Sequence, residues 1–343
     1  MRISGSKRNW KRVLLTATAC LVIAGAGVGV YAGYIYNKAN AALKSMAGGP
    51  KGSPVSDKTD LPDDLKQKPI TVMLTAVDSR DGGGGSLNTD VMMLVTLNPA
   101  THAATVVSIP RDLELKPEKY GLSSHKANYY YAYYYGQDRD TAIPRTKELF
   151  SNIFQVPIDY MAVINFDGFR QMIDALGGLE INVDMDMRYT DSEDGTNINL
   201  KQGLQTLDGK NTLDFLRYRK SNEGTDDSSD IARNERQQIV LGKLIDKLTS
   251  LGGISSWGGL LDIAGNSLKT DIPEETLRDW IYSFRSLKPD TIEFLHLDGR
   301  WDSPYIVVKE EDLVQAMDAL RKRAQPPGNL RQTWHPRIET TLP

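Results

Sequence analysis

Short apolar runs and longer amphipathic stretches alternate along the middle of the chain. The short runs are rich in β-branched residues and are separated by turn residues, which is typical of strands. The longer stretches repeat apolar residues every three or four positions, which predicts helices. The expected strands are 70–77, 91–97, 104–109 and 291–297, and the expected helices are 141–154, 166–176, 231–251, 273–287 and 311–322. Strands mixed with helices predict a layered α/β domain.

The N-terminal segment has a different pattern. Residues 13–36 carry no charge and consist mostly of Val, Leu, Ile, Ala and Gly, which is long enough for a transmembrane helix. A basic cluster in residues 1–12 precedes it, so the positive-inside rule places that tail in the cytoplasm and the rest outside. A cleaved signal peptide would have a shorter apolar run. A lipid-modified Cys20 is disfavoured because apolar sequence continues well past it.

These segments predict an order of domains for a single-pass protein of the cell membrane. Residues 1–12 form a cytoplasmic basic tail, 13–36 a transmembrane helix, and 37–66 an extracytoplasmic tether containing Gly and Pro. Residues 67–324 form the folded domain, and 325–343 a Pro-rich disordered tail.

Composition narrows the function classes. The 343 residues have a formal net charge of -3, so no global basic field suggests nucleic acid as a partner. Cys20 is the single cysteine, which excludes an internal disulfide and a cysteine-based metal site.

Two aspartates flank the first loop of the expected domain. Asp78 follows the first expected strand, and Asp90 opens the second after a glycine-rich loop. Neighbouring strands would bring both carboxylates to one rim of the sheet, where Mg²⁺ commonly binds one or two carboxylates together with substrate phosphates. From the aspartates alone, the simpler interpretation is favoured: Asp78 caps a turn, and Asp90 is a solvated strand end.

Arginines in later stretches add a second interpretation. Alternation along an expected extended segment points Arg217 and Arg219 the same way. On a following helix, Asp230, Arg233 and Gln237 share one face. Arg111 directly follows the third expected strand. Arginine binds phosphate bidentately and a helix N-terminus favours anions, but the spacing fits a pyrophosphate site and a solvated salt-bridge network equally well.

Seven motifs, taken in order, resemble the LytR-CpsA-Psr family of cell-wall ligases. They spread over about 70–250, and a single expected membrane span precedes them. Any one of the motifs is weak, whereas seven in order are specific. They are Val77-Asp78-Ser79-Arg80, Thr89-Asp90-Val91-Met92-Met93-Leu94-Val95, Ser108-Ile109-Pro110-Arg111-Asp112, Ala175-Leu176-Gly177-Gly178-Leu179-Glu180-Ile181, Leu207-Asp208-Gly209, Leu216-Arg217-Tyr218-Arg219, and Arg233 through Gln238.

The resemblance implies a fold and an activity. Members of this family place an α/β domain, with a mixed central β-sheet flanked by helices, outside the cytoplasm behind one transmembrane helix. They transfer teichoic acid, capsular polysaccharide or a similar glycopolymer from an undecaprenyl-pyrophosphate carrier to peptidoglycan, forming a phosphodiester. The implied partners are the lipid-linked polymer, peptidoglycan and the membrane, with a hydrophobic tunnel for the polyprenyl chain.

The resemblance also implies roles for the matching residues. Asp78 and Asp90 are similar to the ligands of Mg²⁺, for which Mn²⁺ is the alternative ion. The implied catalytic residues are Arg111, Arg217, Arg219 and Arg233, and the implied substrate-binding residues are Arg80, Asp230 and Gln237.

The chain departs from the family pattern in two places. Asn88 stands where the family usually has an arginine, which removes one phosphate contact or moves it elsewhere. The polar stretch 220–229 looks longer than usual, so Asp226 and Asp227 remain alternatives to Asp230. No general base is evident, because His125 and Asp112 are equally available.

Three questions stay open at the level of sequence. A hydrolase of lipid pyrophosphates would use nearly the same site with water as the acceptor. A non-enzymatic membrane-bound regulator is the second alternative, although no DNA-binding motif is present. The run 129–135 holds six tyrosines in seven positions, and these either form a sugar-binding surface or, as we slightly favour, pack a helix onto the domain.

Overall fold

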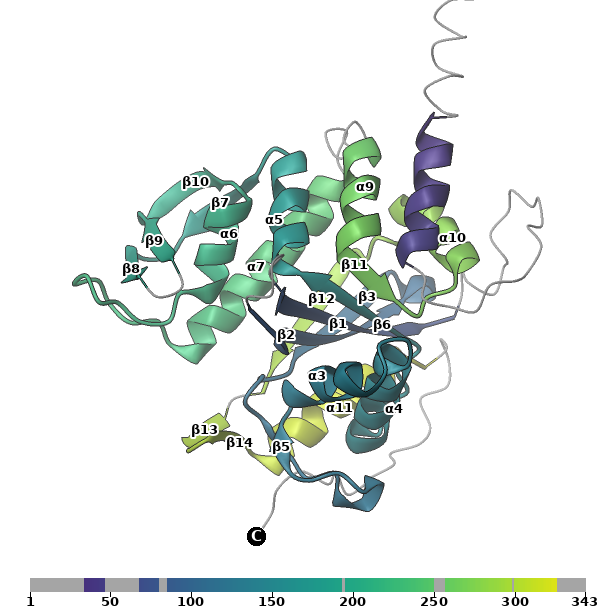
Figure 1. Ribbon diagram of the computed structural model, residues 1–343, viewed down its shortest axis with the longest axis horizontal. Coiled ribbons are helices and arrows are strands. Elements are labelled where there is room, and N and C mark those ends of the chain that lie inside the picture. The colour runs from purple at the N-terminus through teal and green to yellow at the C-terminus, as the bar shows by residue number, and fades with distance from the viewer. Residues whose placement is uncertain are drawn as a thin grey trace, which may run out of the picture.

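The computed structural model describes residues 34–46, 68–79, 85–192, 195–249, 257–297 and 299–325. A six-stranded sheet runs through the centre with helices on both faces (Figure 1). Its strands, in spatial order, are β11 (Leu268–Thr270), β6 (Tyr160–Asn165), β1 (Ile70–Ser79), β2 (Gly85–Asn98), β3 (Ala103–Ser108) and β12 (Thr291–His296). Pairs β1–β6 and β3–β12 are parallel and the other pairs antiparallel, which confirms the predicted mixed sheet flanked by helices.

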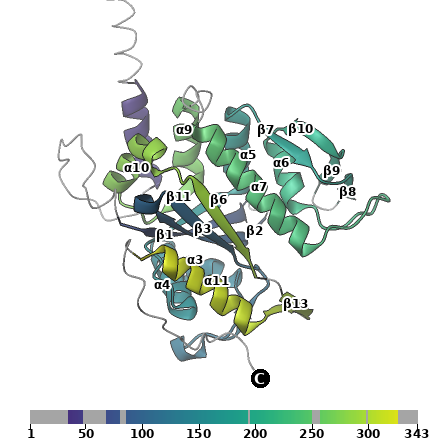
Figure 2. The ribbon, with the colours of Figure 1, turned by 180° about the vertical axis from the view of Figure 1, so that it is seen from behind.

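The main core lies between one face of this sheet and a layer of helices. That layer consists of α3 (Tyr129–Gln137), α4 (Ala142–Phe154) and α11 (Glu310–Arg323), which Figures 1 and 2 both show below the sheet. Met73 and Val77 of β1 point into this core and are almost fully buried beside Phe150 and Leu313. Burial of such side chains contributes roughly 1.5–3 kcal/mol each.

The opposite face of the sheet is covered by a second layer of helices. This layer contains α5 (Phe166–Ala175), α6 (Gly209–Arg217), α7 (Asp230–Thr249), α9 (Trp257–Ser267) and α10 (Glu274–Leu287). Side chains alternate along a strand, so Leu74 and Ala76 of β1 point toward this layer. Both are only half-buried, because a cavity separates this part of the sheet from the helices.

A smaller lobe extends beyond α5 and α6. It contains the antiparallel pairs β7–β10 (Leu179–Val183, Gly203–Leu207) and β8–β9 (Met187–Asp191, Thr196–Leu200), with its own buried cluster around Ile181 and Phe215. Gly178 connects α5 to this lobe with a φ of 81°, and a Cβ there would lie 2.8 Å from the carbonyl oxygen of Leu207. The close approach explains why glycine occurs at this point of the Ala175–Ile181 motif.

Two short ribbons lie at the same end of the sheet as the smaller lobe. They are β4–β5 (Glu114–Leu115, His125–Lys126) and β13–β14 (Gly299–Asp302, Tyr305–Val308), joined by a bridge between Leu113 and Ile306. The remaining elements are the 3₁₀ turns Pro99–Thr101 and Glu118–Tyr120.

Every helix and strand that the periodicity predicts is present, with ends shifted by a few residues. The largest shift is in β2, which begins at Gly85, so Asp90 lies within the strand and does not open it. The first part of β2 contains polar residues such as Ser86 and Asn88 and shows no alternation of apolar and polar positions. The sequence pattern therefore does not predict this part of the strand. Strand β6 was also missed, although Met161-Ala162-Val163-Ile164 is a short apolar run.

The prediction of a tether is wrong for residues 37–46. Residues 34–46 form a helix whose buried side chains, Ala39, Ala42, Leu43 and Met46, recur at helical spacing and pack against Leu261 and Leu277 of α9 and α10. The same spacing is visible in the sequence and could have predicted this helix. Residues 47–66 of the predicted tether, 326–343 of the predicted tail and 13–33 of the predicted span lie outside the described residues. Among the described helices, none combines the length and the apolar character needed to cross a bilayer.

The tyrosine run packs a helix onto the domain. Tyr130, Tyr131 and Tyr134 of α3 are buried in the main core, and the hydroxyl of Tyr130 donates to the carbonyl oxygen of Ser123 at 3.0 Å. Burial raises the pKa of Tyr131 to about 12, so these hydroxyls remain protonated. The packing interpretation is therefore confirmed for the three buried tyrosines.

Candidate functional site

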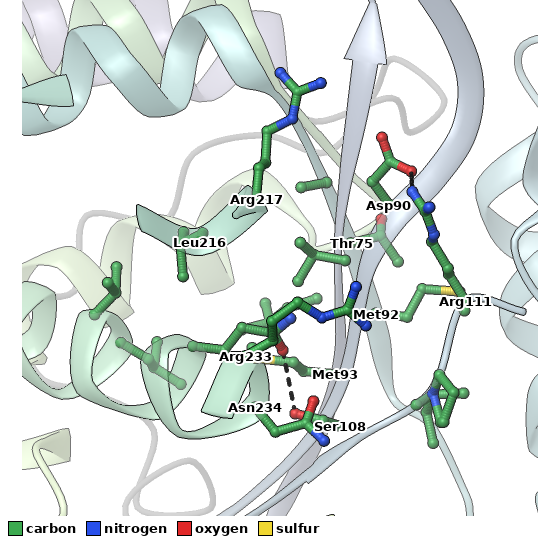
Figure 3. A pocket seen from close by; sticks show the side chains of 18 of the residues that line it. Thr75, Asp90, Met92, Met93, Ser108, Arg111, Leu216, Arg217, Arg233 and Asn234 are labelled. Atoms are coloured by element: carbon green, nitrogen blue, oxygen red, sulfur yellow. Dashed lines mark hydrogen bonds and ion pairs between the residues drawn. The ribbon is translucent and has the colours of Figure 1, made fainter. Parts of the chain in front are cut away.

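A cavity of about 690 Å³ lies between the sheet and helices α5, α6 and α7. Its mouth carries charged side chains, and its interior is apolar. Figure 3 shows Asp90 and Arg111 on one side, and Arg217 and Arg233 on the other. We call the side formed by β1–β3 and the segment after β3 the sheet wall, and the side formed by α5, α6 and α7 the helix wall.

Asp90 reaches the cavity through an irregularity in β2. Ala76 pairs with Val91, but the next residue, Val77, pairs with Thr89, so Asp90 is an extra residue that leaves the ladder. Such a bulge changes the direction of a side chain and is common beside active sites. The bulge therefore turns the Asp90 carboxylate toward the cavity, where its side chain is 26% exposed.

Arg111 forms an ion pair with Asp90 on the sheet wall. Its Nη1 donates to Oδ1 of Asp90 at 2.5 Å, and its Nε lies 3.5 Å from Oδ2 of Asp112. The backbone of Arg111 is held because its carbonyl oxygen accepts from the amide of Asn128 at 3.1 Å. Asp112 is buried and also pairs with Lys126 at 2.8 Å. The sheet wall thus holds a chain of alternating charges.

Arg217 and Arg219 come from the end of α6, which corrects one prediction. The segment is not wholly extended: Arg217 is the last residue of the helix, and Tyr218 is its C-cap, with a φ of -59° and a ψ of 124°. The helix begins at its N-cap Asp208, whose Oδ1 accepts from the amide of Asn211 at 2.8 Å. Tyr218 is fully buried, whereas the arginines on either side of it are exposed. Both arginines line the cavity.

The N-terminus of α7 also opens onto the cavity. Ser229 caps this helix, since its Oγ accepts from the amide of Ala232 at 3.0 Å. Arg233 and Gln237 follow on the face that lines the cavity, and Oγ of Ser108 donates to Oε1 of Gln237 at 3.5 Å. Helix α7 begins at Asp230, one residue before the predicted start, and Arg233 and Gln237 both line the cavity, as expected for residues that share one face.

An ion pair between a buried arginine and an exposed aspartate fixes this end of α7 against the smaller lobe. The side chain of Arg236 is 1% exposed, and its Nε and Nη2 donate to the two carboxylate oxygens of Asp184 at 2.9 and 2.7 Å. Its Nη1 donates to the carbonyl oxygen of Tyr218 at 3.4 Å, between Arg217 and Arg219. Asp184 and Arg236 are 52 positions apart, and no local pattern predicts their pairing.

The interior of the cavity is lined by apolar side chains from both walls. Leu74 and Met93 contribute from the sheet, and Phe169, Leu216 and Leu244 from the helices. Leu74, Phe169, Leu216 and Leu244 remain only half-buried in the folded protein. Apolar surface left open inside a cavity favours an apolar ligand.

Three predicted site residues are less well placed. Alternation puts Asp78 on the same face of β1 as Leu74 and Ala76, opposite Ser86 of β2, but among the described residues it is not part of the cavity lining. Arg80 lies outside the described residues, and so does the side chain of Asp230. Asn88 is half-buried in β2, two residues before Asp90.

The donor set of the sheet wall fits a divalent cation that is shared with a phosphate. Among the described residues no cluster of three or more His, Cys, Asp or Glu side chains could enclose a metal by itself. Mg²⁺ does not need such a cluster, because it usually takes one or two carboxylates and completes its shell with water and phosphate oxygens. Asp90 supplies one carboxylate at the cavity and already attracts a cationic group, Arg111.

The fold and the cavity define a class of protein: an α/β domain whose cavity carries arginines at its mouth and apolar side chains in its interior. A sequence model of the LytR_cpsA_psr family matches residues 30–322. The protein belongs to the LytR_cpsA_psr family, and the match extends beyond the seven motifs to α11.

Named relatives agree with this assignment. The chain is 30% identical over 274 residues to the polyisoprenyl-teichoic acid–peptidoglycan teichoic acid transferase TagU of Bacillus subtilis, covering 80% of this chain and 82% of TagU. It is 31% identical over 296 residues to the corresponding transferase TagV of the same organism, covering 84% and 71%. The structure of TagT bound to LIIa-WTA has the same fold, with a TM-score of 0.58 at 24% identity over 81% of this chain and 98% of that chain.

Proposed function

We propose that this protein transfers a glycopolymer of the teichoic acid class from a polyprenyl-pyrophosphate carrier to peptidoglycan, forming a phosphodiester. Two relatives at 30% identity or more are named as teichoic acid transferases. The observation that carries the proposal is the cavity itself, which joins guanidinium groups at its mouth to an apolar interior. A lipid-linked polymer has the complementary pattern, with a diphosphate between an apolar chain and a polar polymer.

The helix wall would capture the diphosphate. Arg217 and Arg219 are exposed at the cavity mouth, and the capped N-terminus of α7 lies beside them. Guanidinium groups form paired hydrogen bonds with phosphate oxygens, and a helix N-terminus stabilises nearby negative charge. The polyprenyl chain would then extend along apolar side chains such as Leu216 and Leu244.

The sheet wall would hold Mg²⁺ or, as the alternative, Mn²⁺. Asp90 would be one ligand, and Asp78 the second, as the family resemblance implies. When bound, such an ion would neutralise negative charge that develops on the phosphate oxygens. Arg111 would release Asp90 and turn to the phosphate, so that one carboxylate becomes available for the ion and one guanidinium for the substrate.

The transfer step is a phosphoryl substitution. A hydroxyl of the acceptor attacks the phosphorus nearest the polymer, its oxygen forms the new P–O bond, and polyprenyl phosphate leaves. Catalysis of this kind depends mainly on positioning and charge stabilisation. Arg111 would stabilise the charge that develops on the phosphoryl oxygens, while Arg219 and Arg233 hold the diphosphate.

No general base is assigned to this step. His125 stacks on Tyr129 with ring centroids 3.9 Å apart and does not belong to the cavity lining. The carboxylate of Asp112 faces Lys126 and Arg111.

We place the reaction outside the cytoplasm, on a protein anchored in the cell membrane by residues 13–36. The charge-free run and the basic cluster before it support this orientation. The helix at 34–46 continues directly from that run and packs on α9 and α10. A domain held in this way would stay close to the membrane surface, where a lipid-linked substrate is located.

The test is an assay of the purified full-length protein with a short lipid-linked polymer and isolated glycan strands. We expect a covalent polymer–glycan product, together with release of polyprenyl phosphate that becomes faster when the acceptor is added. Release of the same amount of polyprenyl phosphate with and without acceptor, and no joined product, would instead identify a hydrolase of lipid pyrophosphates. If the protein catalyses neither reaction, a non-enzymatic regulator is the remaining interpretation.

A further inference from the structure

An exposed tryptophan lies on the ribbon whose residues Gly299 and Ile306 line the cavity, and it has no role in the site described above. Trp301 lies in β13 of the β13–β14 ribbon, and 55% of its surface is exposed. The ribbon and α7 lie at the same end of the sheet and on opposite sides of it (Figures 1 and 2). An aromatic side chain of this size is usually buried, so its exposure beside a binding site points to a ligand.

The register of the ribbon places Trp301 on the side of the cavity. Trp301 pairs directly with Ile306 in the antiparallel ribbon, and Ile306 lines the cavity. Directly opposed residues project their side chains to the same face of a sheet. Gly299, two residues before Trp301, is on this face too and also lines the cavity. Trp301 therefore extends the wall that begins at Ile306 outward to the solvent.

A chain of contacts joins Trp301 to the centre of the site. The amino group of Lys126 lies 5.7 Å from the centre of the tryptophan ring and pairs with Asp112 at 2.8 Å. Asp112 lies next to Arg111, which pairs with Asp90. The ribbon is fixed to the same segment, because the amide of Ile306 donates to the carbonyl oxygen of Asp112 at 2.8 Å. The position of the ring relative to Arg111 is thus set by the fold.

We propose that Trp301, with Lys126 beside it, forms a subsite for a sugar ring of the acceptor glycan strand. The apolar faces of a sugar stack on an aromatic ring, while amino and carboxylate groups bind its hydroxyls. This subsite rests on the proposed function and names the part of the protein that receives the acceptor.

The direction of the reaction favours the acceptor over the donor polymer as the occupant. Attacking and leaving oxygens lie roughly in line across the transferred phosphorus. The apolar residues that suit the leaving polyprenyl phosphate, such as Leu216 and Leu244, belong to the helix wall. The ribbon joins the opposite wall beside Arg111, which is the side from which the attacking hydroxyl would approach.

The experiment compares three variants of the full-length protein. Trp301→Ala removes the ring, and Trp301→Phe keeps an aromatic face. Arg300→Ala changes the neighbouring residue, which lies in the same exposed strand but projects to the other face of the ribbon. For each we would measure the KM for isolated glycan strands, the cleavage of lipid-linked donor without acceptor, and, by calorimetry, the binding of glycan strands without donor.

We expect Trp301→Ala to raise the acceptor KM and to weaken glycan binding by roughly tenfold, the scale of one lost aromatic contact. Acceptor-free cleavage should stay at the wild-type rate, and Trp301→Phe and Arg300→Ala should remain within about twofold of wild type. An unchanged acceptor KM and unchanged glycan binding in Trp301→Ala would overturn the subsite. A matching loss of acceptor-free donor cleavage would also overturn it, because the ring would then bind the donor polymer.

The calorimetric measurement separates this inference from the proposed function. If wild type binds glycan strands through Trp301 but forms no joined product, the subsite stands and the transfer reaction fails. If wild type transfers polymer while Trp301→Ala does so with an unchanged KM, the transfer reaction stands and the subsite fails.

Discussion

The two walls of the cavity hold their charges in different ways. On the sheet wall each charge has a partner: Arg111 pairs with Asp90, and Lys126 with Asp112. On the helix wall Arg217 and Arg219 are exposed, and within the described part of the chain neither forms an ion pair. They are ordered through the backbone, because the residue between them is buried and its carbonyl oxygen accepts from Arg236.

This difference separates capture of the substrate from chemistry. Exposed guanidinium groups that form no ion pair can bind an anion without first breaking one, so Arg217 and Arg219 suit the first encounter with a diphosphate. The sheet wall must exchange partners before it can contact a phosphate. Its charges therefore suit a role that begins once substrate and metal ion are both present.

The largest effect is expected at the sheet wall, for Arg111→Ala. Loss of one donor to the charge that develops in the transition state commonly costs about 3–4 kcal/mol. We expect the turnover rate to fall on the order of a hundredfold or more, with little change in donor affinity, because Arg111 is already paired with Asp90 in the free protein. Single-turnover rates and direct donor binding would measure the two quantities separately. Full turnover by this variant would remove Arg111 from the site.

The second effect concerns the support of the helix wall. Asp184→Ala leaves Arg236 as a buried cation without its carboxylate, which costs about 3 kcal/mol at the lower end of the range for broken buried pairs. The lower end applies because the Asp184 side chain is 43% exposed. Urea unfolding would measure the loss. Asp186→Ala is the matched control: Asp186 pairs with Lys201 on the surface, and we expect little change there. If both variants were equally stable, the pair of Asp184 and Arg236 would not be what holds α7 in place.

A third effect should appear as affinity alone, for Arg219→Ala. Hydrogen bonds to charged groups contribute about 1.5–3 kcal/mol, so the donor Kd should rise roughly ten- to hundredfold while turnover at saturation changes little. The difference in donor Kd between Arg219→Ala and wild type should become smaller in high salt, because salt screens the charge of the guanidinium group. Lys220→Ala removes a neighbouring exposed charge that does not line the cavity and should leave Kd near the wild-type value. A drop in turnover without a change in Kd would reverse the roles given to the two walls.

The smallest effect is a pH dependence within the helix wall. Burial raises the pKa of Asp214 in α6 above its usual value, and Lys210, 2.6 Å away, partly offsets this rise. A carboxyl with a raised folded-state pKa binds its proton more tightly in the folded protein. Its contribution therefore stabilises the fold at low pH and is lost as the pH rises through the raised pKa.

The variant Asp214→Asn removes this titration. The stability of wild type relative to the variant should therefore decline from pH 4 toward neutral pH, by about 1 kcal/mol or less. Thermal unfolding at a series of pH values would measure the decline. If the stability of wild type relative to the variant instead increased over this pH range, the pKa of Asp214 would be lowered in the folded protein and the prediction would be wrong.

The sequence predicts most of the fold and much of the site, for physical reasons that differ between elements. Strand β1 and helix α4 have regular apolar spacing and are found where the periodicity places them. Strand β6 runs directly into α5 without a turn, so no boundary marks it. The bulge at Asp90 depends on how β2 pairs with β1 and has no local signal.

The candidate site likewise contains residues that the sequence pattern predicts and contacts that it does not. Arg111, Arg217 and Arg219 gather at one cavity, as expected from the ends of the elements that carry them. The pair of Asp184 and Arg236 joins segments far apart in the chain. Such a contact follows only from the packing of the smaller lobe on α7.

The most direct test of the two-wall account is a crystal structure of the protein with a polyprenyl pyrophosphate and Mg²⁺. We expect the diphosphate to lie between Arg111 and Arg219, with Asp90 released from Arg111 and the polyprenyl chain along Leu216 and Leu244. A diphosphate bound away from this cavity, or a polyprenyl chain that leaves the cavity for solvent, would contradict it.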